Sequence, residues 1–276
     1  MRSFPPRRIV CLTEETVETL YLMGEDARIV GVSGYAVRPR QVRKEKPRVA
    51  AFISADLPKI LALEPDLVLT FSDLQAGIVA DLVKAGVAVH AFNQRDVAGI
   101  FAMIETLGGL IGEPAKSAAL CAGLRKQLDE ARARGAALPA RPRIYFEEWD
   151  EPMISGIGWV SELIEAAGGI EVFPDLAMKK SAPERVVTFE QVIAAKPDII
   201  IGSWCGKKFV PERVKARPGF GTIPAVQNDF MREIKSAIIL QPGPAALTDG
   251  LGAIEAIIAE WVAAQGQGKR MLSASA

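Results

Sequence analysis

Two segments of this chain have the same pattern, and that repetition limits what the chain can fold into. Residues 57–70 read LPKILALEPDLVLT and residues 189–202 read FEQVIAAKPDIIIG. Each segment combines a helix-like spacing of apolar residues, a Pro-Asp pair and a short apolar run. Proline disfavours helix at the residue before it, and aspartate suits the turn into a following strand. The repetition therefore predicts two halves built on one helix–turn–strand unit.

Short apolar runs and longer helical stretches alternate along the rest of the chain. Near-continuous apolar runs are typical of strands that are covered on both faces, as in a parallel sheet. This alternation predicts an α/β fold with right-handed crossovers. The predicted strands are residues 8–12, 29–32, 67–71, 87–92, 143–147 and 199–203, and the predicted helices are residues 15–23, 57–63, 78–85, 96–111, 161–167, 189–195 and 248–263.

One further helix, at residues 113–138, lies almost at mid-chain and is rich in strong helix formers. Pro114 suits its first turn, and Pro139 follows its end. With the repeated unit on either side, this helix is predicted to join two Rossmann-like lobes with mostly parallel sheets. The predicted division is an N-terminal α/β lobe at 1–112, a connecting helix at 113–139 and a C-terminal α/β lobe at 140–276. A crossover helix within one continuous sheet is the alternative.

The overall charge of the chain excludes several classes of partner. Lys+Arg and Asp+Glu both number 33, which gives a formal net charge of zero. Nucleic-acid binding and a polybasic membrane surface both need an excess of positive charge. No apolar run reaches the roughly 18 residues of a spanning helix. Because the N-terminal MRSFPPRR shows no signal-peptide pattern, we expect a cytoplasmic protein without a membrane span, or a periplasmic one if a leader was removed.

The residue types that carry most catalytic chemistry are scarce. The only histidine, His90, lies inside an apolar run, and the three cysteines, Cys11, Cys121 and Cys205, are far apart in the sequence. No zinc motif, phosphate-binding loop or nucleophile elbow is present. The carboxylates of residues 147–151 suit a solvated loop as well as acid–base work. We therefore expect no catalytic residues, no metal site and no required cofactor.

Aromatic and polar residues follow the predicted strand ends. In open α/β sheets, ligands bind outside the carboxyl ends of the strands. Several aromatic rings in such a place suit a large flat ligand that is held by stacking. The alternative is that the rings only cap the sheet ends. The candidates are Thr13, Glu14, Tyr35, Phe52, Phe71 and Asn93 in the first half, and Trp149, Trp159, Trp204, Cys205 and Lys207 in the second.

The chain resembles a known family over residues 8–262. Residues 9–24, 30–35 and 57–70 resemble the N-terminal lobe of class III periplasmic binding proteins, which bind iron–siderophore complexes and vitamin B12. The second half is most similar to the cobalamin-binding branch of that superfamily. The stretches that carry this similarity are residues 147–152 (EEWDEP), 158–169 (GWVSELIEAAGG), 195–198 (AKPD), 204–206 (WCG), 217–220 (RPGF) and 241–244 (QPGP).

This resemblance implies a fold and a function. The family has two α/β lobes joined by one long helix, and its vitamin B12 binder lines a cleft between the lobes with aromatic residues. Tyr35, Phe52 and Phe71 match such positions in the first half. Trp149 corresponds to the aromatic residue after the first strand of the second half, and Trp159 and Trp204 align more loosely. The implied ligand is cobalamin or a related corrinoid, bound reversibly.

The resemblance also implies a protein partner. Family members dock to an ABC permease through one surface glutamate on each lobe. Glu190 occupies the second of these positions, but Pro58 occupies the first, and Ala245 replaces the arginine that usually follows the Gly-Pro motif. Since proline offers an arginine neither charge nor a hydrogen-bond acceptor, we expect that this protein does not serve an importer in the usual way.

Three alternative functions stay open from the sequence. The ligand is an iron–siderophore or other metal chelate carried for an ABC importer, or the chain is a cytosolic enzyme acting on a small substrate in the same cleft. An interaction module without a ligand is the third. An enzyme should show a nucleophile–base contact around Cys205, Lys207 or His90, whereas a binding protein needs complementary apolar walls.

Overall fold

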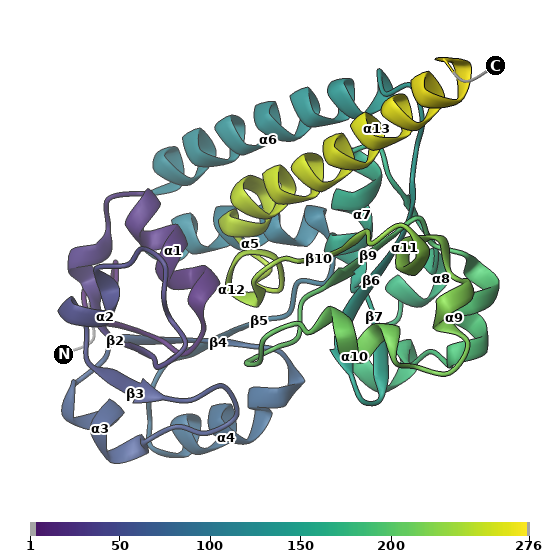
Figure 1. The fold of residues 1–276 in the computed structure, drawn as a ribbon. Coiled ribbons are helices and arrows are strands. Elements are labelled where there is room, and N and C mark those ends of the chain that lie inside the picture. The colour runs from purple at the N-terminus through teal and green to yellow at the C-terminus, as the bar shows by residue number, and fades with distance from the viewer. Residues whose placement is uncertain (1–3, 275–276) are drawn as a thin grey trace. The chain divides into compact units, whose positions relative to one another are not determined.

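The computed structural model describes residues 4–274, so the two ends of the predicted lobes, residues 1–3 and 275–276, lie outside it. Compactness divides the chain into two units. Figure 1 labels the helices and strands of both units. Unit 1 comprises residues 1–125 with 241–245, and unit 2 comprises residues 126–240 with 246–276. This division falls inside the long helix and assigns Gln241–Ala245 to unit 1, whereas the sequence predicted a separate connecting helix. That residues 1–112 and 140–276 are separate domains stays a prediction.

Unit 1 contains a five-stranded parallel sheet in the order β3-β2-β1-β4-β5. The strands are β1 (Ile9–Cys11), β2 (Ile29–Ser33), β3 (Arg48–Ala50), β4 (Leu67–Phe71) and β5 (Val89–Phe92). The order runs outward from β1 in one direction and then restarts at β4 on its other side. Such a switch point is where open parallel sheets place their ligands.

The helices of unit 1 connect these parallel strands. Val10, Leu12, Ile60, Val68 and Leu82 form one buried cluster of its core. The helices are α1 (Glu14–Leu22), α2 (Val42–Glu45), α3 (Leu57–Ala62), α4 (Ala76–Lys84) and α5 (Val97–Leu110), with 3-10 turns at Asp26–Arg28 and Asp73–Gln75, and α6 (Pro114–Ala136) begins in this unit.

Unit 2 contains a second sheet, in the order β10-β9-β6-β7, with β8 paired to β6. Only β7 runs antiparallel to its neighbour. The strands are β6 (Arg143–Asp150), β7 (Met153–Ser155), β8 (Ile170–Glu171), β9 (Ile199–Gly202) and β10 (Met231–Glu233). The helices are α7 (Gly158–Ala166), α8 (Pro174–Ala177), α9 (Phe189–Ala195), α10 (Pro211–Lys215), α11 (Pro224–Gln227), α12 (Ser236–Ile239) and α13 (Leu251–Ala274), with 3-10 turns at Ala182–Arg185 and Phe220–Thr222 and a π turn at Ala246–Gly250.

The predicted fold class is confirmed, and all six predicted strands are present in two separate sheets. The four strands that were not predicted, β3, β7, β8 and β10, have only two or three residues each. The described part of the chain contains no helix long and apolar enough to cross a membrane.

The repeated Pro-Asp pairs have the same structural role in both units. The Asp66 carboxylate accepts hydrogen bonds from the backbone N–H groups of Arg7 and Arg8, at 2.8 and 3.0 Å. In unit 2, the Asp198 carboxylate accepts from the backbone N–H of Arg143 at 2.8 Å. Each aspartate therefore ties the start of the repeated strand to the start of the neighbouring central strand, β1 or β6. The side chains of Arg8 and Arg143 also donate from Nε to the carbonyls of Leu63 and Ala195, at 2.9 and 3.0 Å, so both copies pair the Pro-Asp turn with an arginine at the start of the central strand.

Candidate functional site

Most of the ligand contacts predicted for the first half of the chain lie at the carboxyl ends of the unit 1 strands. Tyr35 is 52% exposed, Phe52 is half-buried and Asn93 is exposed. Phe71 is buried, and the guanidinium of Arg95 lies 5.2 Å from its ring centroid. Tyr35 and Phe52 therefore offer ring surface to a ligand, whereas Arg95 already covers part of Phe71.

Gln75, which the sequence did not single out, connects the segments that carry these rings. Its side-chain oxygen accepts from the backbone N–H of Phe71 at 3.0 Å. Its amide nitrogen donates to the carbonyls of Leu12 and Phe52, at 3.2 and 2.8 Å. Gln75 is fully buried, so these bonds fix the loops after β1 and β3 relative to the end of β4.

Thr13 and Glu14, which were predicted as ligand contacts, are buried together with Glu15 at the start of α1. The Thr13 hydroxyl donates to Glu15 Oε1 at 2.6 Å. Burial raises the pKa of Glu14 to about 7 and the pKa of Glu15 to about 8. Thr13 thus has an internal partner, and Glu15 is the buried carboxyl that sequence analysis missed. Its position directly after β1 was the available signal.

In unit 2, Trp149 lies inside β6, near its end, and Lys207 lies in the loop that follows β9. Trp149 is half-buried, and the Lys207 ammonium lies 3.9 Å from its ring centroid. The indole N–H of Trp149 donates to the carbonyl of Glu151 at 2.8 Å. The same ammonium pairs with the Asp150 carboxylate, and Asp150 was not predicted as a site residue. Cys205, in the same loop as Lys207, is exposed.

The other two predicted tryptophans are packed inside unit 2. Trp204 is 2% exposed, and its indole N–H donates to Glu147 Oε1 at 2.9 Å. Trp159 is 3% exposed and donates to the carbonyl of Ile239 at 2.8 Å. In this structure these rings fill the core, which agrees with the alternative interpretation of the aromatic set. A ligand contact for either ring stays a prediction and requires the ring to be uncovered.

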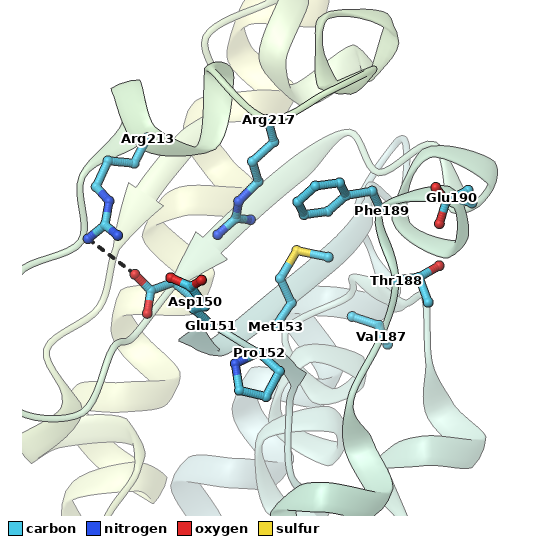
Figure 2. Close-up of a pocket in the computed structure, with 10 residues that line it drawn as sticks. All are labelled: Asp150, Glu151, Pro152, Met153, Val187, Thr188, Phe189, Glu190, Arg213 and Arg217. Atoms are coloured by element: carbon cyan, nitrogen blue, oxygen red, sulfur yellow. Dashed lines mark ion pairs between the residues drawn. The ribbon is translucent and has the colours of Figure 1, made fainter.

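A pocket of about 520 Å³ opens beside Asp150 (Figure 2). Its lining combines an apolar surface with charged groups of both signs. The Arg217 guanidinium, at one side, is bound at both ends by the buried Glu147 carboxylate, at 2.6 and 2.9 Å. The lining residues are Asp150, Glu151, Pro152, Met153, Val187, Thr188, Phe189, Glu190, Arg213 and Arg217.

Glu190, the predicted docking residue, lies at the edge of this pocket in the first turn of α9. Hydrogen bonds from its own backbone N–H and from the Thr188 hydroxyl lower the pKa of its carboxyl. Glu190 is therefore ionised at neutral pH. In unit 1, Pro58 is exposed, and the nearby Asp56 carboxylate pairs with Lys59 at 2.8 Å.

The side chains that could bind a metal are dispersed in the described part of the chain. In residues 4–266, no group of three or more His, Cys, Asp and Glu side chains could hold a metal ion. His90 packs edge-on against Phe92, with 4.3 Å between ring centroids, and desolvation lowers its pKa. His90 therefore has a packing role at the end of the unit 1 sheet.

Comparison with known proteins identifies the family. A family model described as "Periplasmic binding protein" matches residues 9–237. The chain belongs to this family. Among its relatives, the "Vitamin B12-binding protein" of Vibrio cholerae is 26% identical over 250 residues, with 89% of this chain and 87% of that protein covered. The "Cobalamin-binding protein" of Halobacterium salinarum is 27% identical over 202 residues, which cover 71% of this chain but 53% of that protein.

The chain thus spans about half the length of the Halobacterium relatives that it matches. Several solved structures share the fold of this chain. A possible iron-binding protein from Staphylococcus epidermidis superposes with a TM-score of 0.79 at 22% identity, with 92% of this chain and 99% of that one covered. The periplasmic vitamin B12-binding protein of Vibrio cholerae gives 0.73 at 24%, with 94% and 99% covered. A heme-binding protein from Roseiflexus gives 0.77 at 22%, with 91% and 98% covered.

The comparisons also bear on the expected compartment. The family consists of periplasmic binding proteins, so the expectation of a cytoplasmic protein receives no support. Family membership likewise favours a binding protein over the enzyme alternative.

Proposed function

We propose that this member of the periplasmic binding protein family reversibly binds cobalamin or a related corrinoid, without covalent chemistry. The observation that carries the proposal is its similarity to a vitamin B12-binding protein over 89% of the chain. Ring surfaces at the carboxyl ends of both sheets support it. Tyr35 in unit 1 is exposed and Trp149 in unit 2 is half-buried, and rings of this kind hold a flat macrocycle by stacking.

A second candidate is an iron-containing chelate. Structures with the same fold include heme-binding proteins and a possible iron-binding protein. This candidate requires the same stacking surfaces, so the two ligand classes must be separated by direct binding.

Visible absorption titration with cyanocobalamin, dicyanocobinamide and hemin tests both candidates. We expect a saturable spectral change with at least one corrinoid. Trp149→Ala should weaken binding by roughly 1–3 kcal/mol, because it removes a stacked ring. Phe4→Ala is a matched control, since Phe4 is an exposed ring, 80% accessible, outside the predicted site. Saturable binding of hemin alone contradicts the corrinoid proposal, and unchanged affinity in Trp149→Ala contradicts the assigned site.

We further propose that the protein acts in the periplasm and that Glu190 is its contact with an ABC permease. Glu190 is ionised at a pocket edge, as a residue that pairs with arginine must be. In unit 1, Pro58 offers no carboxylate, and Lys59 holds the Asp56 carboxylate, so docking there differs from the usual pattern. The test is cell fractionation followed by recovery of membrane partners. Loss of permease binding in Glu190→Ala supports the proposal, and recovery of the protein in the cytoplasm contradicts it.

A further inference from the structure

Two cations, Lys207 and Arg213, pair with one carboxylate, that of Asp150, which follows Trp149 in the chain. The Asp150 side chain is 3% exposed. The Lys207 ammonium pairs with Asp150 Oδ1. Arg213 Nη1 lies 3.3 Å from Asp150 Oδ2, and Figure 2 marks this ion pair with a dashed line. Lys207 and Arg213 thus share the single Asp150 carboxylate. This cluster therefore has an excess of positive charge.

Both cations have hydrogen-bonding capacity that the protein does not use. Within the described chain, Asp150 is the sole side-chain acceptor of the Lys207 ammonium. The Arg213 side chain is 56% exposed, and its contact with Asp150 is an ion pair rather than a hydrogen bond. A guanidinium has five N–H donors in a fork that matches a carboxylate, and an ammonium has three. The cluster can thus accept a further anionic group without losing Asp150.

The adjoining pocket has room for a side arm that ends in such an anion. One part of its lining is apolar, with Met153, Val187 and Phe189. Arg213 lies beside Asp150, whereas Glu190 lies beyond Phe189 in the view of Figure 2. Because Glu147 already neutralises Arg217, Arg213 is the cation of this pocket that is available to an anion. An aliphatic arm along Met153 would place its terminal group near Arg213.

Unit 1 repeats the same combination of ring, cation and aspartate. The Arg95 guanidinium lies 5.2 Å from the Phe71 ring centroid, and its Nη2 lies 3.2 Å from Asp73 Oδ1. Asp73 is 75% exposed, so the pair is open to solvent. Each unit therefore combines an aromatic ring with a cation that an aspartate holds.

From this arrangement we propose that the ligand carries free carboxylates at its edge and that Lys207 and Arg213 bind them. The inference rests on the proposed corrinoid function and narrows its substrate class to acidic rather than fully amidated corrinoids. A neutral macrocycle over Trp149 would desolvate two cations that share one carboxylate, which is unfavourable. A carboxylate at the macrocycle edge supplies the missing charge through charge-assisted hydrogen bonds.

The test compares two corrinoids that differ in peripheral charge. Dicyanocobyrinic acid has free carboxylates, whereas dicyanocobinamide has amides at its periphery. Absorption titration should show that the affinity for the acid is at least about tenfold higher, because one charge-assisted hydrogen bond changes a dissociation constant by about that factor. Lys207→Gln and Arg213→Gln should each remove most of that preference and flatten its dependence on salt, with little change for dicyanocobinamide. Lys208→Gln is the matched control and should keep the preference.

The possible failures are distinguishable. Equal affinity for the two corrinoids, or a preference for the acid that survives in both Gln variants, overturns this inference and leaves the corrinoid proposal in place. Binding of neither corrinoid overturns both. Hemin, which also has free carboxylates, is included as a third probe. Hemin binding that depends on Lys207, without corrinoid binding, overturns the corrinoid proposal but supports recognition of an acidic edge.

Discussion

At the scale of single residues, the Glu147–Arg217 pair is the most consequential buried interaction near the unit 2 pocket. Glu147 is fully buried and Arg217 holds both of its oxygens. Arg217→Met would leave an uncompensated buried carboxylate, which costs about 3–5 kcal/mol of unfolding free energy. Urea denaturation measures this loss. Arg213→Met should change stability by about 1 kcal/mol or less, because the Arg213 side chain is 56% exposed and Asp150 keeps Lys207 as a partner.

The same pair offers an internal check. Combining Arg217→Met with Glu147→Gln removes the stranded charge while the amide oxygen still accepts from Trp204. The double variant should therefore be more stable than Arg217→Met alone. Equal stability of the single and double variants would contradict the idea that buried charge causes the loss.

Glu15 provides a prediction about pH. Burial raises the pKa of its carboxyl to about 8 in the folded protein, whereas an unfolded glutamate titrates near ~4.3. The folded state therefore keeps a proton that the unfolded state releases. Stability should fall as pH rises between these two values, by up to about 1.4 kcal/mol per pH unit from this group.

The variant that isolates this effect is Glu15→Gln, which stays neutral at all pH values and can still accept from Thr13. Its unfolding free energy should exceed that of the parent by a margin that grows as pH rises from 5 to 8. Glu130→Gln, at an exposed glutamate in α6, should show no such divergence. Parallel stability curves for Glu15→Gln and the parent from pH 5 to 8 would argue against the assigned titration.

At the scale of elements, helix α6 contains two glycines in opposite situations. A Cβ at Gly135 would lie 2.7 Å from the Ala166 carbonyl oxygen and from the Gly168 nitrogen, whereas a Cβ at Gly123 would meet nothing within 4 Å. Gly135→Ala should therefore destabilise the protein by about 1–3 kcal/mol through overpacking. Gly123→Ala should stabilise it by up to about 1 kcal/mol through helix propensity. Thermal unfolding of the two variants with the same assay checks both signs.

The elements also show what the sequence could predict. β4 matches its predicted range because a continuous apolar run of five residues is a clear signal. Strands β3, β8 and β10 are too short to display a period. The Asp150–Lys207 contact joins residues that are 57 apart in sequence, so no local pattern reveals it. Trp149 lies near the end of β6 and Trp204 lies just after β9. Their sequence positions are alike, and only tertiary packing leaves Trp149 half-buried and Trp204 fully buried.

At the scale of the whole molecule, the chain crosses between its two units three times, whereas a single connecting helix would give one crossing. It passes from unit 1 to unit 2 within α6, returns for Gln241–Ala245 and leaves again. The returning segment is bound inside unit 1. The Ala245 N–H donates to Glu18 Oε2 at 2.9 Å, and the Gln94 amide donates to the Pro242 carbonyl at 2.9 Å. Gly243 approaches so closely that a Cβ there would lie 2.6 Å from Glu15 Cβ. The Gly-Pro motif thus has a structural role in unit 1.

Because each unit has its own sheet and core, calorimetry can ask which units a ligand stabilises. A ligand that binds only folded protein adds about 2.7 kcal/mol of stability at a concentration a hundred times its Kd. Tyr35 belongs to unit 1 and Trp149 to unit 2, so the unfolding temperature of each unit reports whether the corrinoid binds to that unit. Trp149→Ala should reduce the shift of unit 2 and Tyr35→Ala that of unit 1, since each variant removes ring surface from the unit that carries it. A shift confined to the unfolding of unit 2, unaffected by Tyr35→Ala, would restrict the site to the Trp149–Lys207 surface.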